Sequence, residues 1–320
     1  MNAPFNPTHI QPSIIQNTES MDFAAAACDF QNESFIDNAH AHIAQLPEAV
    51  RQAIADFHKK PHKSGALLIK GLPVGQLPDT PVTPTTPTSK DCTSELTLLT
   101  IAKTLGEPIG YEPELGGRII QNILPTKTAS TRQVSTSSKV SLMFHTEAAF
   151  HPHRPAYLLL LCLKGDPAAS TTLASIREVL PLLSSAAAAP LFQARSRTGV
   201  DGSYLHGREN TLGEPVPVLS GELDCPSMVF DADLMVGMDD AAQSALAELS
   251  RAVAACHTSV CLESGDLLIV DNAVAVHGRS PFTPRFDGTD RWLQRTFVVA
   301  DLTASAKERV GRVISTEFGL

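Results

Sequence analysis

Apolar side chains recur at two different spacings along the chain, and each spacing predicts one kind of secondary structure. A recurrence every three or four residues is typical of a helix with one buried face. After Pro47, the residues Val50, Ile54 and Phe57 follow this spacing, and Ser94 stands where a later helix needs a capping side chain. The segments that predict helices are 47–60, 94–105 and 240–256.

Short runs rich in aliphatic and β-branched residues predict strands. No strict alternation of strand and helix links these runs, and no GxGxxG or Walker A motif occurs. The pattern therefore favours a mainly β fold, a sheet sandwich or barrel flanked by helices. The segments that predict strands are 65–72, 118–124, 157–163, 227–230, 266–270 and 293–299.

Prolines interrupt these elements over one long stretch. Residues 73–93 are rich in Pro and Thr, and the spacing of the prolines excludes a helix or a central strand. We expect this stretch to be a surface loop, either a lid or an inert insertion, within a single domain of residues 36–320. Residues 1–35 are expected to be loosely structured.

Composition and charge exclude several classes of protein. The net charge of −9 disfavours a nucleic-acid-binding surface, which needs clustered Lys and Arg. No apolar run approaches the ~20 residues of a membrane span, and the N-terminus does not resemble a signal peptide. The cysteines are scattered without a CxxC pair, which predicts reduced thiols, no disulfide framework and a cytoplasmic location. A small-molecule enzyme fits these observations.

Two residues in the segment SLMFHTEAAF are suited to binding a metal ion. If residues 143–147 are extended, His145 and Glu147 project from the same face, because side chains alternate along a strand. His277, just past the predicted strand 266–270, is the best candidate for a second imidazole. Two histidines and one carboxylate form the facial triad that leaves positions open on Fe(II). An HxE pair by itself is more often an ordinary surface or core pair.

Two arginines after His277 strengthen the metal hypothesis. Arg291 lies fourteen residues beyond His277, and Arg295 follows four residues later in the apolar segment WLQRTFVV. A dicarboxylate that chelates iron at one end needs a cation at its other end, and a guanidinium binds a carboxylate through two parallel hydrogen bonds. The alternative is a surface salt bridge from Arg291 to Asp287 or Asp290.

Two long blocks of the sequence resemble the signature blocks of a known family. They read FHTEAAFHPHRPAYLLLLCLKGDPAASTTLASIREVLPLL and GDLLIVDNAVAVHGRSPFTPRFDGTDRWLQRTFVV. Both are similar to the clavaminate synthase-like group of Fe(II)/2-oxoglutarate oxygenases, within the wider taurine-dioxygenase superfamily. A weaker likeness continues upstream through IIQNILP and GALLIKGLP. The resemblance implies a double-stranded β-helix, a cupin-like jelly roll, with helices around it.

The resemblance also implies a role for particular residues. The iron ligands would be His145, Glu147 and His277. The distal carboxylate of 2-oxoglutarate would bind Arg291 and the hydroxyl of Thr171, or of Thr172 if the preceding loop is shorter. The α-carboxylate and amino group of an amino-acid substrate would be bound by Arg295, Ser135 and Glu147. Gln121, in the segment RIIQNIL, is a further candidate for the amino end. The cofactors implied are Fe(II), with 2-oxoglutarate and O2 as co-substrates.

The segment SMVFDADL bears on the substrate. If it is extended, Asp231 and Asp233 face the same side, where two carboxylates repel unless a cation lies between them. The pair resembles the acidic motif of the free lysine and arginine hydroxylases of this group, although two solvated aspartates would look the same. The expected activity is hydroxylation of free L-lysine at C3, with succinate and CO2 as co-products. The alternatives are arginine 3-hydroxylation, lysine 4-hydroxylation, or a non-catalytic amino-acid-binding jelly roll.

Overall fold

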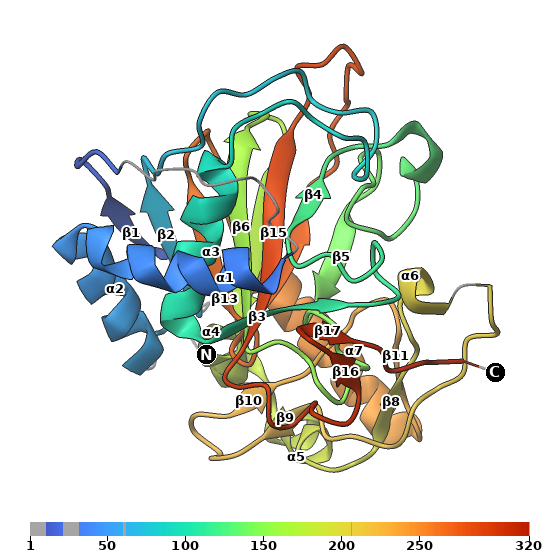
Figure 1. Ribbon diagram of the computed structural model, residues 1–320. Helices are drawn as coiled ribbons and strands as arrows, with labels where there is room; N and C mark the ends of the chain where they lie inside the picture. Colours follow the sequence, from blue (N-terminus) through green and yellow to red (C-terminus); the bar gives the residue numbers. More distant parts are fainter. Residues whose placement is uncertain (1–10, 22–31, 60–61, 206, 320) are drawn as a thin grey trace.

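Two β-sheets, with helices packed on their outer faces, organise the chain (Figure 1). The computed structural model describes residues 11–21, 32–59, 62–205 and 207–319. The helices are α1 (Glu33–Asn38), α2 (Glu48–Lys59), α3 (Thr93–Leu105), α4 (Ile176–Val179), α5 (Ser185–Leu191), α6 (Gly202–Leu205) and α7 (Asp240–Cys256), with 3-10 turns at Ala39–Gln45, Lys127–Ala129 and Leu180–Leu182. The strands are β1 (Ser13–Gln16), β2 (Ala66–Lys70), β3 (Glu107–Tyr111), β4 (Gln121–Ile123), β5 (Leu142–His145), β6 (Tyr157–Lys164), β7 (Ser170–Ser175), β8 (Ser196–Thr198), β9 (Leu219–Ser220), β10 (Ser227–Met228), β11 (Met235–Gly237), β12 (Thr258–Cys261), β13 (Leu267–Asp271), β14 (Ala275–Arg279), β15 (Trp292–Val299), β16 (Arg309–Val310) and β17 (Val313–Ile314).

The larger sheet and the smaller sheet are connected by consecutive strands. The larger sheet has the order β1-β2-β13-β6-β15-β3-β17-β16, with β4 paired to β15, and the smaller sheet has the order β12-β7-β14-β5. β13 belongs to the larger sheet and β14 to the smaller one, so the short turn between them carries the chain from one sheet to the other. This arrangement confirms the expected mainly β core flanked by helices.

The strand β6 shows why the larger sheet is buried on both faces. Leu158, Leu160 and Cys162 point into a core shared with Leu173 and Val260 of the smaller sheet. The alternate residues of β6 face the other way and pack against apolar side chains of α2 and α3, at the front of the sheet in Figure 1. A strand covered on both faces reads as a continuous apolar run, and this explains the sequence YLLLLCLK.

The predicted helices are confirmed, apart from one cap. The segment 47–60 contains α2, whose buried residues are Val50, Ile54 and Phe57, and 240–256 coincides with α7. Ser94, however, lies inside α3, because the helix begins one residue earlier with Cys92 at its N-cap position. The side chain of Asp91 accepts a hydrogen bond from the backbone of Thr93 at 3.0 Å and supplies the polar contact that was predicted for Ser94.

Several expected elements have different bounds. Two predicted strands are shorter than expected, since only β4 forms within 118–124 and only β10 within 227–230. Residues 1–35 include β1, which pairs in parallel with β2, so this part of the N-terminal segment is ordered in the larger sheet. Residues 1–10 and 22–31 lie outside the described part of the chain.

Hydrogen bonds attach the Pro/Thr-rich loop 73–93 to the segment before β15 and to α3. Thr80 donates through its backbone to Gly288 O at 2.8 Å and through its hydroxyl to Asp290 O at 2.6 Å. Thr97 of α3 donates to Pro73 O at 2.8 Å. The loop therefore holds the segment that leads into β15, and Figure 1 shows the two crossing at the top of the molecule.

The cysteines differ from expectation at one position. Cys92 is disulfide-bonded, which corrects the prediction of a chain without disulfides. Cys162, Cys225, Cys256 and Cys261 are free, and Cys162 is a buried thiol. Within the described ranges, no helix is both long and apolar enough to cross a membrane.

Candidate metal centre and substrate pocket

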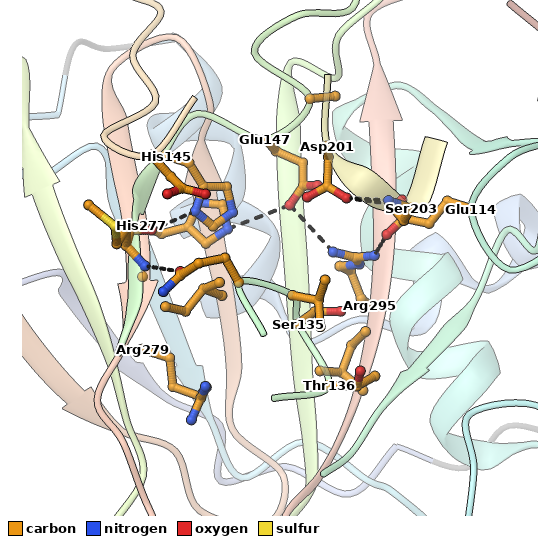
Figure 2. Close-up of a pocket in the computed structure, with 18 of the residues that line it drawn as sticks. Glu114, Ser135, Thr136, His145, Glu147, Asp201, Ser203, His277, Arg279 and Arg295 are labelled. Atoms are coloured by element: carbon orange, nitrogen blue, oxygen red, sulfur yellow. Dashed lines mark hydrogen bonds and ion pairs between the residues drawn. The ribbon is translucent and has the colours of Figure 1, made fainter. Parts of the chain in front are cut away.

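Three side chains suited to binding a metal ion converge between the two sheets (Figure 2). His145 ends β5 and faces His277 of β14 across the pair of strands, with ring centroids 4.3 Å apart. Glu147 approaches from the turn after β5, and its Oε2 lies 3.5 Å from His277 Nε2. One ligand atom from each residue can be chosen so that all lie within 4.8 Å of one another. The three residues that the sequence singled out are therefore brought together.

The path that brings Glu147 to this place differs from the expected one. β5 ends at His145, and the chain turns at Glu147 instead of continuing as a strand. Asn272 directs the turn: its Oδ1 accepts from Glu147 N at 2.8 Å, and its Nδ2 donates to Glu147 O at 3.0 Å and to Pro155 O at 2.9 Å. The side-chain amide of Asn272, from the turn between β13 and β14, therefore fixes the backbone of Glu147, and strand alternation does not. His277 likewise lies within β14 and not beyond a strand end.

The protonation states and contacts of the three residues suit a divalent cation. Burial would raise the pKa of Glu147, but nearby Arg295 and His277 outweigh it and hold the pKa at about 2. Burial, together with His145, lowers the pKa of His277 to about 4. The carboxylate is thus ionised and the imidazole neutral near pH 7, the forms that bind metals. Glu147 Oε2 is buried without a hydrogen-bond partner among the described residues, and His145 Nδ1 donates to Met143 O at 2.8 Å, so His145 Nε2 is available.

Arg291 is a buried cation that forms no ion pair with a carboxylate among the described residues. It immediately precedes β15, is 6% exposed, and donates from Nη2 to Thr171 Oγ1 at 3.4 Å. The alternative salt bridges are not formed: Asp290 accepts from backbone N–H groups, and Asp287 Oδ1 accepts from Thr289. Burial lowers the pKa of Arg291, and the smaller opposing effects of Cys162 and Asp166 do not offset it. Of the two candidate hydroxyls, Thr171 lines the pocket with Arg291.

Arg295 has the opposite surroundings. Its guanidinium contacts the carboxylate of Glu114 and the side-chain oxygen of Gln121, and its Nη1 lies 3.5 Å from Glu147 Oε2. Glu114 also accepts from Tyr204 Oη at 3.2 Å. Gln121 lies behind Arg295 and is absent from the pocket wall, so the predicted contact of Gln121 with a substrate amino group is not supported by its position. Sequence reasoning missed Glu114, whose only signal was a charged residue before an apolar strand.

The remaining candidate residues lie in the wall of the same cavity, which has a volume of about 340 Å³. Ser135 lies in the irregular segment between β4 and β5, on the side of Arg295 in Figure 2. Asp231 and Asp233 also line the cavity, but residues 231–234 form a turn and not a strand. Asp231 Oδ1 holds that turn by accepting from the backbone of Asp233 and Leu234, both at 2.8 Å. A turn, and not the alternation of side chains along a strand, therefore brings both carboxylates to the cavity wall.

Comparison with known proteins identifies the family. Residues 36–297 match the family described as taurine catabolism dioxygenase TauD, TfdA family. The chain is 40% identical to an L-lysine 3-hydroxylase of Catenulispora acidiphila (93% of this chain, 85% of the relative). It is 39% identical to an L-asparagine oxygenase of Streptomyces coelicolor (82% and 79%), and 35% identical to clavaminate synthase 2 of Streptomyces clavuligerus (88% and 89%).

Solved structures agree with the fold and with the predicted cofactors. An asparagine oxygenase in complex with Fe(II), 3-hydroxyasparagine and succinate superposes with a TM-score of 0.85 at 35% identity (90% of this chain, 91% of the other). The non-haem iron oxygenase OrfP, in complex with Fe and α-ketoglutaric acid, superposes with a TM-score of 0.81 at 31% identity (91% and 94%). The chain therefore belongs to the TauD/TfdA family, as a clavaminate synthase-like oxygenase dependent on iron(II), 2-oxoglutarate and O2.

Proposed function

We propose that this chain hydroxylates a free basic L-amino acid, with L-lysine at C3 as the preferred reaction. The observation that carries the proposal is a group of three carboxylates in the cavity wall that have no ion-pair partner. Asp201, Asp231 and Asp233 line it, and none forms an ion pair with a described cation. A substrate with a cationic side chain can bind between these carboxylates and relieve their mutual repulsion. The 40% identity to an L-lysine 3-hydroxylase supports lysine over other basic amino acids.

The iron and 2-oxoglutarate sites follow from the geometry described above. We assign iron(II) to His145, Glu147 and His277, and the distal carboxylate of 2-oxoglutarate to Arg291 and Thr171. When bound, the iron and 2-oxoglutarate supply the oxidising power for O2-dependent hydroxylation, with succinate and CO2 as co-products. The protein contributes position: the strands β5 and β14 hold the metal ligands, and Arg291 orients the co-substrate from the start of β15.

The amino-acid backbone of the substrate is assigned to the Arg295 end of the cavity. Arg295 and Ser135 receive the α-carboxylate, and Glu147 receives the α-ammonium group. Gln121 and Glu114 hold the guanidinium from behind, so only its Nη1 edge is directed towards Glu147. A zwitterion satisfies this pair of opposite charges better than an amine or an acid alone.

The side chain of the substrate is assigned to Asp231 and Asp233. Asp233→Asn is the sharper variant, because its carboxylate does not hold the turn. We expect the KM for lysine to rise about tenfold or more, as for loss of one charged hydrogen bond, while the KM for 2-oxoglutarate stays unchanged. Asp224→Asn, an exposed carboxylate away from the cavity wall, is the matched control. An unchanged KM for lysine in Asp233→Asn would remove this residue from the substrate site.

The deciding experiment is turnover with a panel of amino acids. Protein loaded anaerobically with Fe(II) is given 2-oxoglutarate, O2 and lysine, arginine, ornithine or asparagine, and succinate and hydroxylated product are measured together. Addition of one oxygen atom to lysine at C3, with matching succinate, supports the proposal. Hydroxylation of arginine, or of C4 of lysine, corrects the substrate or the carbon. Hydroxylation of asparagine alone would show that the three carboxylates do not select a basic side chain, and lysine binding without succinate would indicate a non-catalytic receptor.

We also propose that the protein acts in the cytoplasm and that its partner is a small amino-acid substrate. The net charge of −9 supports a protein that binds neither nucleic acid nor an anionic membrane surface. The disulfide at Cys92 argues in the other direction on location, because such bonds are rare in reducing compartments. Thiol labelling of Cys92 in acid-quenched cells tests this point: labelling without prior reduction supports a cytoplasmic location, and protection opposes it.

A further inference from the structure

A third buried arginine lies beside the proposed metal centre and has no part in the roles assigned above. Arg279 ends β14, two residues after His277, and is only 4% exposed. The strand pairing with β5 shifts register between His277 and Arg279. Figure 2 shows the Arg279 side chain directed away from the two histidines. A buried charge in such a place is costly unless its N–H groups are satisfied, so its partners indicate its purpose.

Every hydrogen-bond acceptor of this guanidinium among the described residues is neutral. Nη2 donates to Ser137 Oγ at 2.8 Å and to Val140 O at 3.2 Å. Nη1 donates to Ser138 O at 3.3 Å and to Ser280 O at 3.0 Å. Three of the four acceptors therefore belong to one short segment, residues 137–140. A planar guanidinium can reach several acceptors at once, whereas a lysine ammonium acts as a single point.

The clamped segment continues directly into the wall of the substrate cavity. Residues 132–136 line the cavity and form no helix or strand. Isolated turn and side-chain hydrogen bonds, such as Thr126 N to Thr136 O and Gln133 Nε2 to Ser141 O, hold this segment in place of a regular ladder. Ser137 and Ser138 are almost fully buried, and Phe282 N donates to Ser138 O at 2.8 Å. The attachment at 137–140 thus ties this part of the wall to the strand that carries His277.

We propose that Arg279 is a positioning residue that clamps residues 137–140 to β14 and so holds the cavity wall 132–136 in place against the bound amino acid. The proposal rests on the proposed function, because Ser135 of that wall is assigned to the substrate α-carboxylate. It predicts that loss of the clamp lets the amino acid shift relative to the iron. With a reductant such as ascorbate in the assay, which supplies the two electrons that reduce the second oxygen atom of O2 to water, oxidation of 2-oxoglutarate then continues without hydroxylation of the amino acid.

The test compares variants of the fully loaded enzyme. Arg279→Met keeps the length of the side chain but removes its N–H groups, Arg279→Lys keeps the charge, and Ser137→Ala removes one acceptor. Arg285→Met is the matched control, because Arg285 is exposed and absent from the cavity wall. Succinate and hydroxylated amino acid are measured in the same reaction, together with both KM values. Amide hydrogen exchange of residues 132–140 is measured separately.

For Arg279→Met we expect a rise of about tenfold in the KM for the amino acid and succinate in excess of hydroxylated product. Exchange at 132–140 should accelerate while exchange in α7 stays unchanged. Ser137→Ala should show the same changes more weakly, which keeps the test decisive if Arg279→Met does not fold. Arg279→Lys should recover part of the coupling.

Two results would contradict the proposed clamping role of Arg279. One is unchanged coupling and exchange in both Arg279→Met and Ser137→Ala. The other is a rise in the KM for 2-oxoglutarate alone, which would make Arg279 a cation for the co-substrate. If the wild-type enzyme hydroxylates no amino acid, the proposed function fails, and faster exchange at 132–140 in the variants still decides whether the clamp exists.

Discussion

Replacing Arg291 by Met tests the assignment of the co-substrate site from two directions. The guanidinium is buried with only a 3.4 Å contact to Thr171 Oγ1. Removal of one partner from a buried, hydrogen-bonded charge pair costs about 2–5 kcal/mol, so the Kd for 2-oxoglutarate should rise by about 30-fold to several thousand-fold. The free energy of unfolding of the protein without 2-oxoglutarate should stay the same or increase in this variant. Replacement of buried charge by a packed apolar side chain is often neutral or stabilising by about 1–4 kcal/mol.

Calorimetric titration of anaerobic Fe(II) protein with 2-oxoglutarate measures the first effect, and chemical unfolding measures the second. Wild-type protein should gain about 2.7 kcal/mol of stability at a 2-oxoglutarate concentration of 100 Kd, and Arg291→Met should gain about 0.9 kcal/mol or less at that concentration. Arg285→Met, an exposed arginine nearby in sequence, serves as the control. The reasoning is refuted if Arg291→Met binds 2-oxoglutarate like the wild type, or if the variant without 2-oxoglutarate is strongly destabilised, because Arg291 would then have an internal partner.

The remaining predictions concern the metal ligands and the buried polar groups. His277→Ala should lose Fe(II) binding, measured by titration under anaerobic conditions, and with it all succinate formation; full activity would contradict the iron assignment. Asn272→Ala leaves three buried backbone groups without their partner at about 1–3 kcal/mol each, and it should weaken metal binding by about 10- to 100-fold; a change in neither property would remove its orienting role. Burial, then His153, lowers the pKa of His151 to about 3. The unfolded chain therefore binds a proton at this imidazole near pH 6.5, whereas the folded chain stays unprotonated there. The free energy of unfolding should decrease as the pH is lowered from about 6 to about 4, by about 1.4 kcal/mol per pH unit for this group. Urea unfolding should show this slope reduced in His151→Gln, and equal slopes would contradict the shift.

Local pattern was sufficient for the elements whose burial is repetitive. Sequence pattern predicted α2 and α7 from an apolar stripe on one helix face, and β6 from a continuous apolar run. These patterns are informative because one face or both faces of a regular element are buried. Pattern failed where a single tertiary contact sets the boundary. The start of α3 follows from Asp91, and the turn at Asp231 follows from its own carboxylate, neither of which changes the hydrophobic pattern.

The sequence by itself determined the family, the cofactors and the identity of the candidate metal ligands, because long signature blocks preserve the chemistry of a site together with its spacing. Only the tertiary structure decided how these residues meet. Asn272 turns Glu147 towards the histidines, Glu114 engages Arg295, and Arg279 binds the segment next to the cavity wall. Each of these contacts joins residues far apart in the chain, through hydrogen bonds whose energy depends on burial and distance. Neither quantity can be read from the order of the amino acids.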